Sequence, residues 1–106
     1  MFEPTHEVFR TLADPTRRGL FERLALEGEL SVRALTEGGA ISQPAVSQHL
    51  KALKAAGLVA EQRQGRNVLY SPRPDGLRPL VDWMAVHAVL WRDSFDRLET
   101  LLDRMD

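Results

Sequence analysis

The sequence predicts a single, mainly α-helical domain that contains one small β-hairpin. Apolar residues recur at helical spacing along most of the 106 residues, and this spacing is broken only over residues 58–72. The composition, 43% hydrophobic and 27% charged, is ordinary for a soluble globular domain. Because a chain of this length builds only a modest core, association with a second copy is an expected route to stability.

Two helices are expected in the first quarter of the chain. The stretch EPTHEVFRTL, residues 3–12, places Phe9 and its apolar neighbours on one face. The second helix follows in ADPTRRGLFERLALEG, where Asp14 is a suitable N-cap and the proline after it fits the first helical position. Gly28 ends this helix.

Two further helices follow. ELSVRALTEGG forms a short helix that begins after Ser31 as N-cap and stops at its two glycines. ISQPAVSQHLKALKAAGLV is expected to begin after Ser42 as N-cap, with Gly57 as the left-handed exit. The buried face of this helix consists of Val46, Leu50 and Leu53.

The segment LVAEQRQGRNVLYSP, residues 58–72, is expected to form the β-hairpin. Its β-branched and aromatic residues flank the tetrapeptide QGRN. Gly65 and Asn67 in that tetrapeptide tolerate the positive φ that tight hairpin turns require. Pro72 and Pro74 end the second strand.

Residues 75–105 are expected to be helical again and to form a dimerisation surface. Their apolar seam has a 3.5-residue spacing and consists of Leu77, Val81, Met84, Ala88, Trp91, Phe95, Leu98, Leu102 and Met105. A single helix of this length would run about 45 Å, further than so small a domain can cover, so the seam indicates a partner chain. One helix and two helices are both compatible with the sequence.

The order of these elements is that of a winged helix-turn-helix. A short helix, a glycine turn and a second helix with a polar outer face form a helix-turn-helix over about residues 31–56, and the hairpin at 58–72 is the wing. Together with the C-terminal helix they make one domain over residues 1–106. In this architecture the second helix enters the major groove of duplex DNA and the wing reaches the flanking backbone.

The charge distribution favours a nucleic-acid partner. The formal net charge is −1, but residues 42–74 carry +4, whereas residues 1–41 and 75–106 carry −2 and −3. Local potential governs where a phosphate backbone docks, so the acidic total does not argue against DNA binding.

Candidate DNA-binding residues lie on the polar side of the second helix and at the tip of the wing. They are Ser42, Gln43, Ala45, Ser47, Gln48, Lys51, Arg63 and Arg66. Glutamine can pair with adenine, serine with donors or acceptors, and alanine with a thymine methyl group. The lysine and the arginines are expected on phosphates, with the minor groove as a second option for the arginines.

Other interpretations of these polar residues stay open. The outer face of the helix could be merely solvated, or it could bind an acidic protein partner instead of DNA. Arg17 and Arg18 could contact a phosphate or pair with Glu22. His49 is expected to pack at the domain edge, with a DNA contact as the alternative.

Three segments, LADPTRRGLFERL, ISQPAVSQHLKALKAAGLV and RQGRNVLYSP, resemble the ArsR family of bacterial winged-helix repressors over roughly residues 5–90. The resemblance implies a homodimer formed by the first and last helices, repression by operator binding, and release by an effector. Because a dimer has two recognition helices, we expect the operator to be an imperfect palindrome. The expected interface contains Phe9, Met84, Ala88, Trp91, Phe95, Leu98 and Leu102. Trp83, with two of these aromatic residues, could instead line a pocket for a small-molecule effector.

The sequence departs from the family at its metal sites. Metal-sensing members carry cysteines in the helix before the recognition helix, where this chain has Ser31 and Arg33 and no thiol. Other members use an Asp-x-His pair and a distant His and Glu, whereas Asp82 and His87 are five residues apart and no second histidine follows. We therefore expect a repressor that does not respond to metal and has no cofactor.

The sequence argues against an enzyme, a membrane or exported protein, and a metal-binding protein. The chain has no cysteine, no glycine-rich phosphate loop and no Ser-His-Asp context, so an enzyme is not expected. No apolar run approaches the roughly 20 residues of a membrane span, and no signal-like segment opens the chain, so a cytoplasmic location follows by default. A metal site shared across a dimer by His6, His87 and Asp93 has little support from the sequence.

Overall fold

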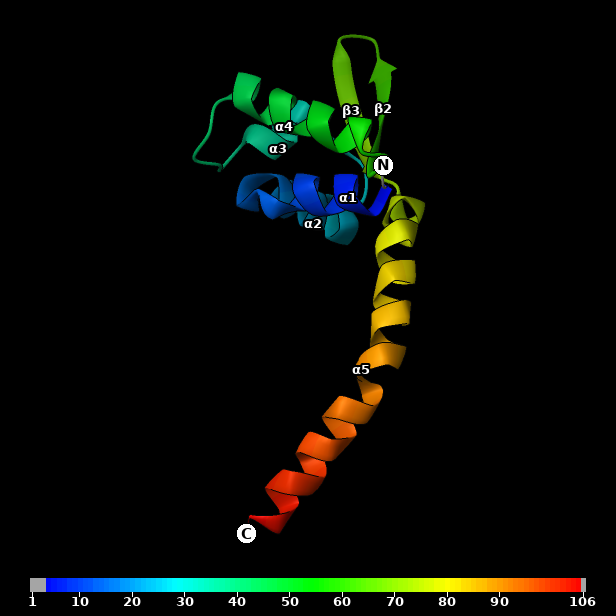
Figure 1. The fold of residues 1–106 in the computed structure, drawn as a ribbon. Coiled ribbons are helices and arrows are strands. Elements are labelled where there is room, and N and C mark those ends of the chain that lie inside the picture. The colour runs from blue at the N-terminus through cyan, green and yellow to red at the C-terminus, as the bar shows by residue number, and fades with distance from the viewer. Residues whose placement is uncertain (1–3, 106) are drawn as a thin grey trace.

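A computed structural model describes residues 4–105 as five α-helices, three strands and a 3₁₀ turn (Figure 1). In chain order these are α1 (Pro4–Ala13), α2 (Pro15–Glu27), β1 (Leu30–Ser31), α3 (Val32–Thr36), α4 (Gln43–Ala55), β2 (Val59–Gln64), β3 (Asn67–Pro72), η1 (Pro74–Leu77) and α5 (Arg78–Arg104). The mainly helical winged fold expected from the sequence is therefore confirmed. Glu3, the expected first residue of the first helix, lies outside the described residues.

The helices begin where polar caps were expected. The Asp14 carboxylate accepts the Arg17 backbone N–H at 2.9 Å. The Ser31 hydroxyl accepts the Ala34 N–H at 3.0 Å, and the Ser42 hydroxyl accepts from the first turn of α4 at 3.4 Å. Each cap satisfies a backbone donor that has no partner inside its own helix, which fixes where α2, α3 and α4 start.

The core is formed where α2, α3 and α4 pack on the base of the wing. The predicted buried face of α4 is confirmed, because Val46, Leu50 and Leu53 are 1%, 0% and 0% exposed. The other core residues are Val8, Leu20, Phe21, Leu24, Val32, Leu35, Leu58, Val59 and Tyr70. This packing holds the polar face of α4 outward.

The sheet has three antiparallel strands in the order β1-β3-β2, one more than the hairpin expected from the sequence. In the added pairing, Leu30 lies opposite Tyr70 and Ser31 opposite Leu69. A two-residue strand followed at once by a helix leaves no periodic pattern in the sequence, so the prediction was incomplete. The pairing fixes the start of α3 beside the wing.

The tip of the wing is a two-residue turn formed by Gly65 and Arg66, because Gln64 pairs with Asn67. Gly65 has φ +61°, as expected for the first central residue of a type II′ turn. Asn67, which also tolerates positive φ, does not use it here, because no non-glycine residue in the described part of the chain has positive φ. Asn67 belongs to β3 instead.

The exit of α4 is closed by its own backbone and by η1. The Leu58 N–H donates to the Leu53 carbonyl at 3.0 Å and the Gly57 N–H to the Lys54 carbonyl at 3.0 Å, which is the pattern of a Schellman cap. Gly57 has φ +80°. The backbone of Gly76 in η1 packs directly on this cap, so the start of the C-terminal helix is fixed against the end of α4.

The C-terminal helix α5 is one continuous helix, which answers the question that the sequence left open. It begins at Arg78 rather than at residue 75, because Pro74–Leu77 form the 3₁₀ turn η1. Leu77 and Leu80 pack on the core, and Thr5 of α1 donates to the Pro79 carbonyl at 3.3 Å. Beyond this attachment α5 projects away from the rest of the chain (Figure 1), which gives an overall extent of 63 Å.

Candidate nucleic-acid interface

The polar face of α4 presents most of the residues predicted to contact DNA. Gln43, Gln48 and Lys51 are exposed, whereas Ala45 and Ser47 are half-buried. The exposed Ser42 uses its hydroxyl oxygen to cap the helix, which leaves the O–H free to donate. The helix therefore offers amide, hydroxyl and ammonium groups, which suit base edges and phosphates.

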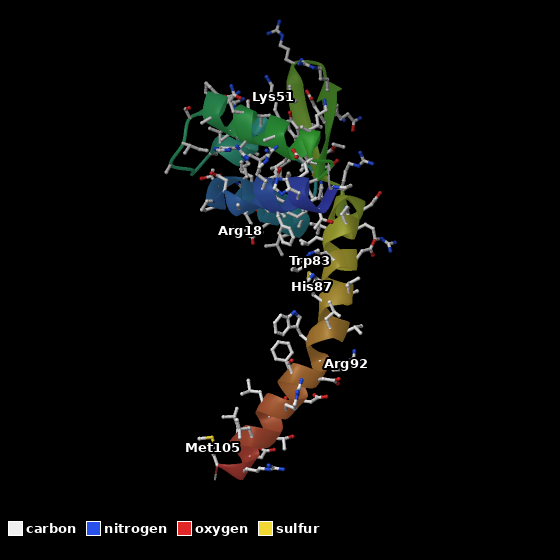
Figure 2. All side chains as sticks on the ribbon, viewed as in Figure 1. Arg18, Lys51, Trp83, His87, Arg92 and Met105 are labelled. Carbon is white, nitrogen blue, oxygen red and sulfur yellow. The ribbon has the colours of Figure 1, made fainter. Side chains whose placement is uncertain are left out.

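A groove of about 610 Å³ separates this helix from the wing. Five of the eight predicted residues line it: Gln43, Ser47, Lys51, Arg63 and Arg66. In Figure 2, Lys51 lies on α4 beside the strands of the wing. Ser42, Ala45 and Gln48 lie outside the lining. The structure thus brings the α4 and wing residues to one groove and places Gln48 on an open part of the helix.

Among the polar groove residues that the sequence reasoning did not assign to DNA binding, Arg33 and Asn67 are the two that could contact a nucleic acid and are exposed. Arg33 was considered only as a replacement for a metal-binding cysteine. The signal that could have found it is its position between Val32 and Leu35, which makes it the outward residue of the first helix of the helix-turn-helix. Asn67 was assigned to the turn, but it begins β3 and faces the groove.

Glu61 is the only carboxylate among the groove-lining residues, and its charge is compensated by neighbouring cations. The Lys54 ammonium donates to it at 2.9 Å, and Arg63 lies 4.0 Å away. The hydrogen bond from Lys54 lowers the pKa of Glu61, and the same contact raises the pKa of Lys54. Both groups are therefore charged at neutral pH, and their ion pair links α4 to β2.

Arg17, Arg18 and His49 lie between α1, α2 and α4, outside the groove lining. The Arg17 Nε–H donates to His49 Nδ1 at 3.3 Å, and the Asp14 carboxylate is 3.9 Å from the same ring nitrogen. Arg18 donates to the Leu12 carbonyl at 2.8 Å. Within residues 4–105 neither arginine pairs with Glu22, so the ion pair considered from the sequence is not formed. Through its contacts with Arg17 and Asp14, His49 connects α4 to the start of α2.

A second surface runs along α5 and is apolar. Trp83, Met84, His87, Ala88, Trp91 and Phe95 line a hollow of about 500 Å³ on it. Phe9 of α1 meets Trp83 edge-on with ring centroids 5.1 Å apart. The expected interface residues on α5 are all exposed, Trp91 by 54% and Phe95 by 61%. Trp83 and His87 project to one side of α5 and Arg92 to the other (Figure 2).

Residues 4–105 hold neither a cluster of metal-binding side chains nor a membrane-spanning helix. No group of three or more His, Cys, Asp or Glu side chains is arranged to hold a metal ion. None of the helices in this part of the chain combines the length and the apolar character needed to cross a membrane.

The α3–α4 pair and the wing beside it define a winged helix-turn-helix protein, and comparison with known proteins agrees. A helix-turn-helix domain family matches residues 12–62. The transcriptional repressor SdpR of Bacillus subtilis is 33% identical over 79 residues, which cover 74% of this chain and 87% of that protein. The transcriptional regulator Rv2034 of Mycobacterium tuberculosis is 47% identical over 72 residues, 68% of this chain but only 66% of that protein.

Solved structures give the same result. The crystal structure of an ArsR-family transcriptional regulator superposes with a TM-score of 0.76 at 26% identity, covering 84% of this chain and 91% of that one. A homodimeric winged helix-turn-helix DNA-binding domain from Mycobacterium bovis superposes with a TM-score of 0.64 at 26% identity, covering 80% of each chain. The chain belongs to the ArsR family of helix-turn-helix transcriptional regulators, which are not enzymes.

Proposed function

We propose that this protein is a transcriptional repressor that binds a palindromic operator as a homodimer and does not respond to metal. One observation supports DNA binding above the others. Polar residues of α4 and cations of the wing line a single groove, although they are separated in the sequence. A recognition helix flanked by a cationic wing is the arrangement in which a helix enters the major groove while the wing holds the backbone.

The roles of individual residues follow from their chemistry and position. Base edges are read from α4 by Gln48, which is exposed outside the groove, and by Gln43 and Ser47, which line it. Lys51, Arg63 and Arg66 bind phosphates, as do most basic side chains in protein–DNA complexes. Ser42 and Ala45, at the start of α4, contact the sugar–phosphate backbone or a thymine methyl group.

The homodimer forms through α5 and the adjacent face of α1. From Met84 to Leu102, the large apolar side chains of α5 are more than half exposed, so this part of the helix needs a partner. The seam includes Trp91, Phe95, Leu98 and Leu102. Phe9, which already packs on Trp83, extends the surface onto α1. The Mycobacterium bovis relative is a homodimer. Two-fold symmetry then places two recognition helices about 34 Å apart on an operator with matching symmetry.

The absence of a metal response is proposed from the residues present. The chain has no cysteine, and Ser31, whose hydroxyl caps α3, stands where metal-sensing members have a thiolate. Release of the operator by a small-molecule effector stays part of the proposal, and such a regulator acts in the cytoplasm.

The proposal is tested by selecting duplexes from random-sequence DNA with the purified protein, and then measuring affinity against unselected duplex at several salt concentrations. We expect an enriched palindrome that binds about 10³-fold or more tightly than random DNA, and an affinity that falls linearly on a log–log plot against salt. Repeating the binding with added divalent metals should change nothing. No enrichment, or an affinity indifferent to salt, would instead favour a protein partner.

A further inference from the structure

Arg33 is the basic residue of the groove that comes from the first helix of the helix-turn-helix. Its neighbours Val32 and Leu35 are 7% and 3% exposed and belong to the core, whereas Arg33 is exposed and lines the groove. Its guanidinium makes no hydrogen bond or ion pair with any other residue between 4 and 105. The two core anchors on either side hold α3 so that this side chain faces outward.

The short strand β1 explains why Arg33 lies beside the wing. Leu30 and Ser31 pair with Tyr70 and Leu69 of β3, so α3 starts directly against the second strand of the wing. The Ser31 cap then begins the helix one residue after the pairing ends. Arg33, two residues further on, therefore stands across the groove from α4 and next to the wing.

The charge of the groove suits a polyanion. Four basic side chains line it, contributed by α3, α4 and the wing: Arg33, Lys51, Arg63 and Arg66. The one acidic lining residue, Glu61, is already paired with Lys54 at 2.9 Å. Every other lining residue is uncharged. The groove has a volume of about 610 Å³, so it is a hollow of appreciable size between α3, α4 and the wing.

We propose that the part of this groove between α3 and the wing holds a segment of the DNA sugar–phosphate backbone and that Arg33 is a phosphate-binding residue on its α3 side. The inference rests on the proposed function and adds a contact that neither the recognition helix nor the wing supplies. Guanidinium groups bind phosphate through paired N–H donors, and the first helix of a helix-turn-helix crosses the backbone. A backbone held between Arg33 and the wing arginines fixes the register of α4 on the bases.

The test measures affinity for the selected operator and for random duplex over a series of KCl concentrations. It compares the full-length wild type with Arg33→Gln, Arg33→Lys and the control Arg23→Gln. Arg23 lies on α2, pairs with Glu27 at 2.9 Å and is outside the groove lining, so the control removes the same charge elsewhere. Thermal unfolding checks that each variant is folded.

We expect Arg33→Gln to weaken binding to both duplexes by a similar factor. The slope of log K against log[KCl] should become shallower by about 0.9 for each subunit, or about 1.8 for a homodimer. Arg33→Lys should keep most of the slope, and Arg23→Gln all of it. A folded Arg33→Gln variant with the wild-type slope would overturn this inference alone. Failure of the wild type to prefer the operator would overturn the proposed function as well.

Discussion

Gly76 permits the close approach of the C-terminal helix to the end of the recognition helix, and replacing it with alanine should disturb both. A Cβ atom at this position would stand 2.2 Å from the Gly57 carbonyl oxygen, 2.8 Å from its carbon and 3.1 Å from the Leu58 Cα. All three atoms belong to the backbone, so no side chain can rotate away to make room. The Schellman cap of α4 or the turn η1 would have to move.

The size of the effect follows from these separations. The nearest contact is more than 1 Å inside the ~3.5 Å at which two non-bonded heavy atoms are best placed. Forcing an extra methyl group into a packed site costs roughly 1–3 kcal/mol, and a clash with backbone alone belongs at the upper end. We expect Gly76→Ala to lower the free energy of unfolding by about 2–3 kcal/mol, which lowers Tm by roughly 10–20 °C in a domain of this size.

Gly19 provides the matched control. It lies in the interior of α2, is exposed, and a Cβ there would meet nothing within 4 Å. Gly19→Ala should therefore stabilise the fold by about 0.5–1 kcal/mol, because alanine loses less backbone entropy in a helix. Thermal unfolding followed by circular dichroism, at one protein concentration because a dimer's Tm depends on it, measures both variants. If Gly76→Ala were as stable as Gly19→Ala, the close approach would be refuted.

Three further predictions concern the proposed dimer, the wing and one helix cap. Trp91→Glu should produce monomers in sedimentation experiments. The control Thr100→Glu should stay dimeric, because residue 100 lies two and a half turns further along α5 and on its opposite side. A dimeric Trp91→Glu variant would place the partner surface elsewhere. Arg66→Ala should weaken operator and random DNA alike and flatten the salt dependence, and an unchanged slope would remove Arg66 from the phosphate contacts. The hydrogen bond from the Arg17 backbone N–H lowers the pKa of Asp14 from its ordinary value of 3.8. The Asp14 carboxylate therefore stabilises the fold above about pH 4, and this stabilisation is lost as the pH falls through the lowered pKa. The difference in Tm between wild type and Asp14→Asn should therefore narrow in acid, and a constant difference would contradict this role of the charge.

Local chemistry made much of the fold predictable from the sequence. A capping side chain acts within three residues of itself, so the starts of α2, α3 and α4 could be assigned from Asp14, Ser31 and Ser42. The buried face of α4 followed from helical spacing, and the turn of the wing followed from Gly65. These features depend on neighbours in the sequence.

Features that depend on residues far apart in the sequence were missed or only partly predicted. The strand β1 exists only because Leu30 and Ser31 pair with β3, some forty residues later, and this pairing brings Arg33 to the groove. The turn η1 depends on the packing of Gly76 against Gly57, which no periodicity reveals. The groove-lining Gln43, Ser47 and Lys51 of α4 and the two wing arginines were therefore among the residues named from the sequence, whereas Arg33 of α3 was not.

Reading of DNA sequence by α4 can be tested most directly at Gln48. Gln48 is exposed on α4 and lies outside the groove lining, so its loss should leave the phosphate contacts of the groove in place. The decisive measurement is the affinity of Gln48→Ala for the selected operator and for random duplex at the same salt concentration. We expect a loss of about 1–3 kcal/mol in binding free energy on the operator and little change on random DNA. An equal loss on both duplexes would contradict sequence reading by this residue.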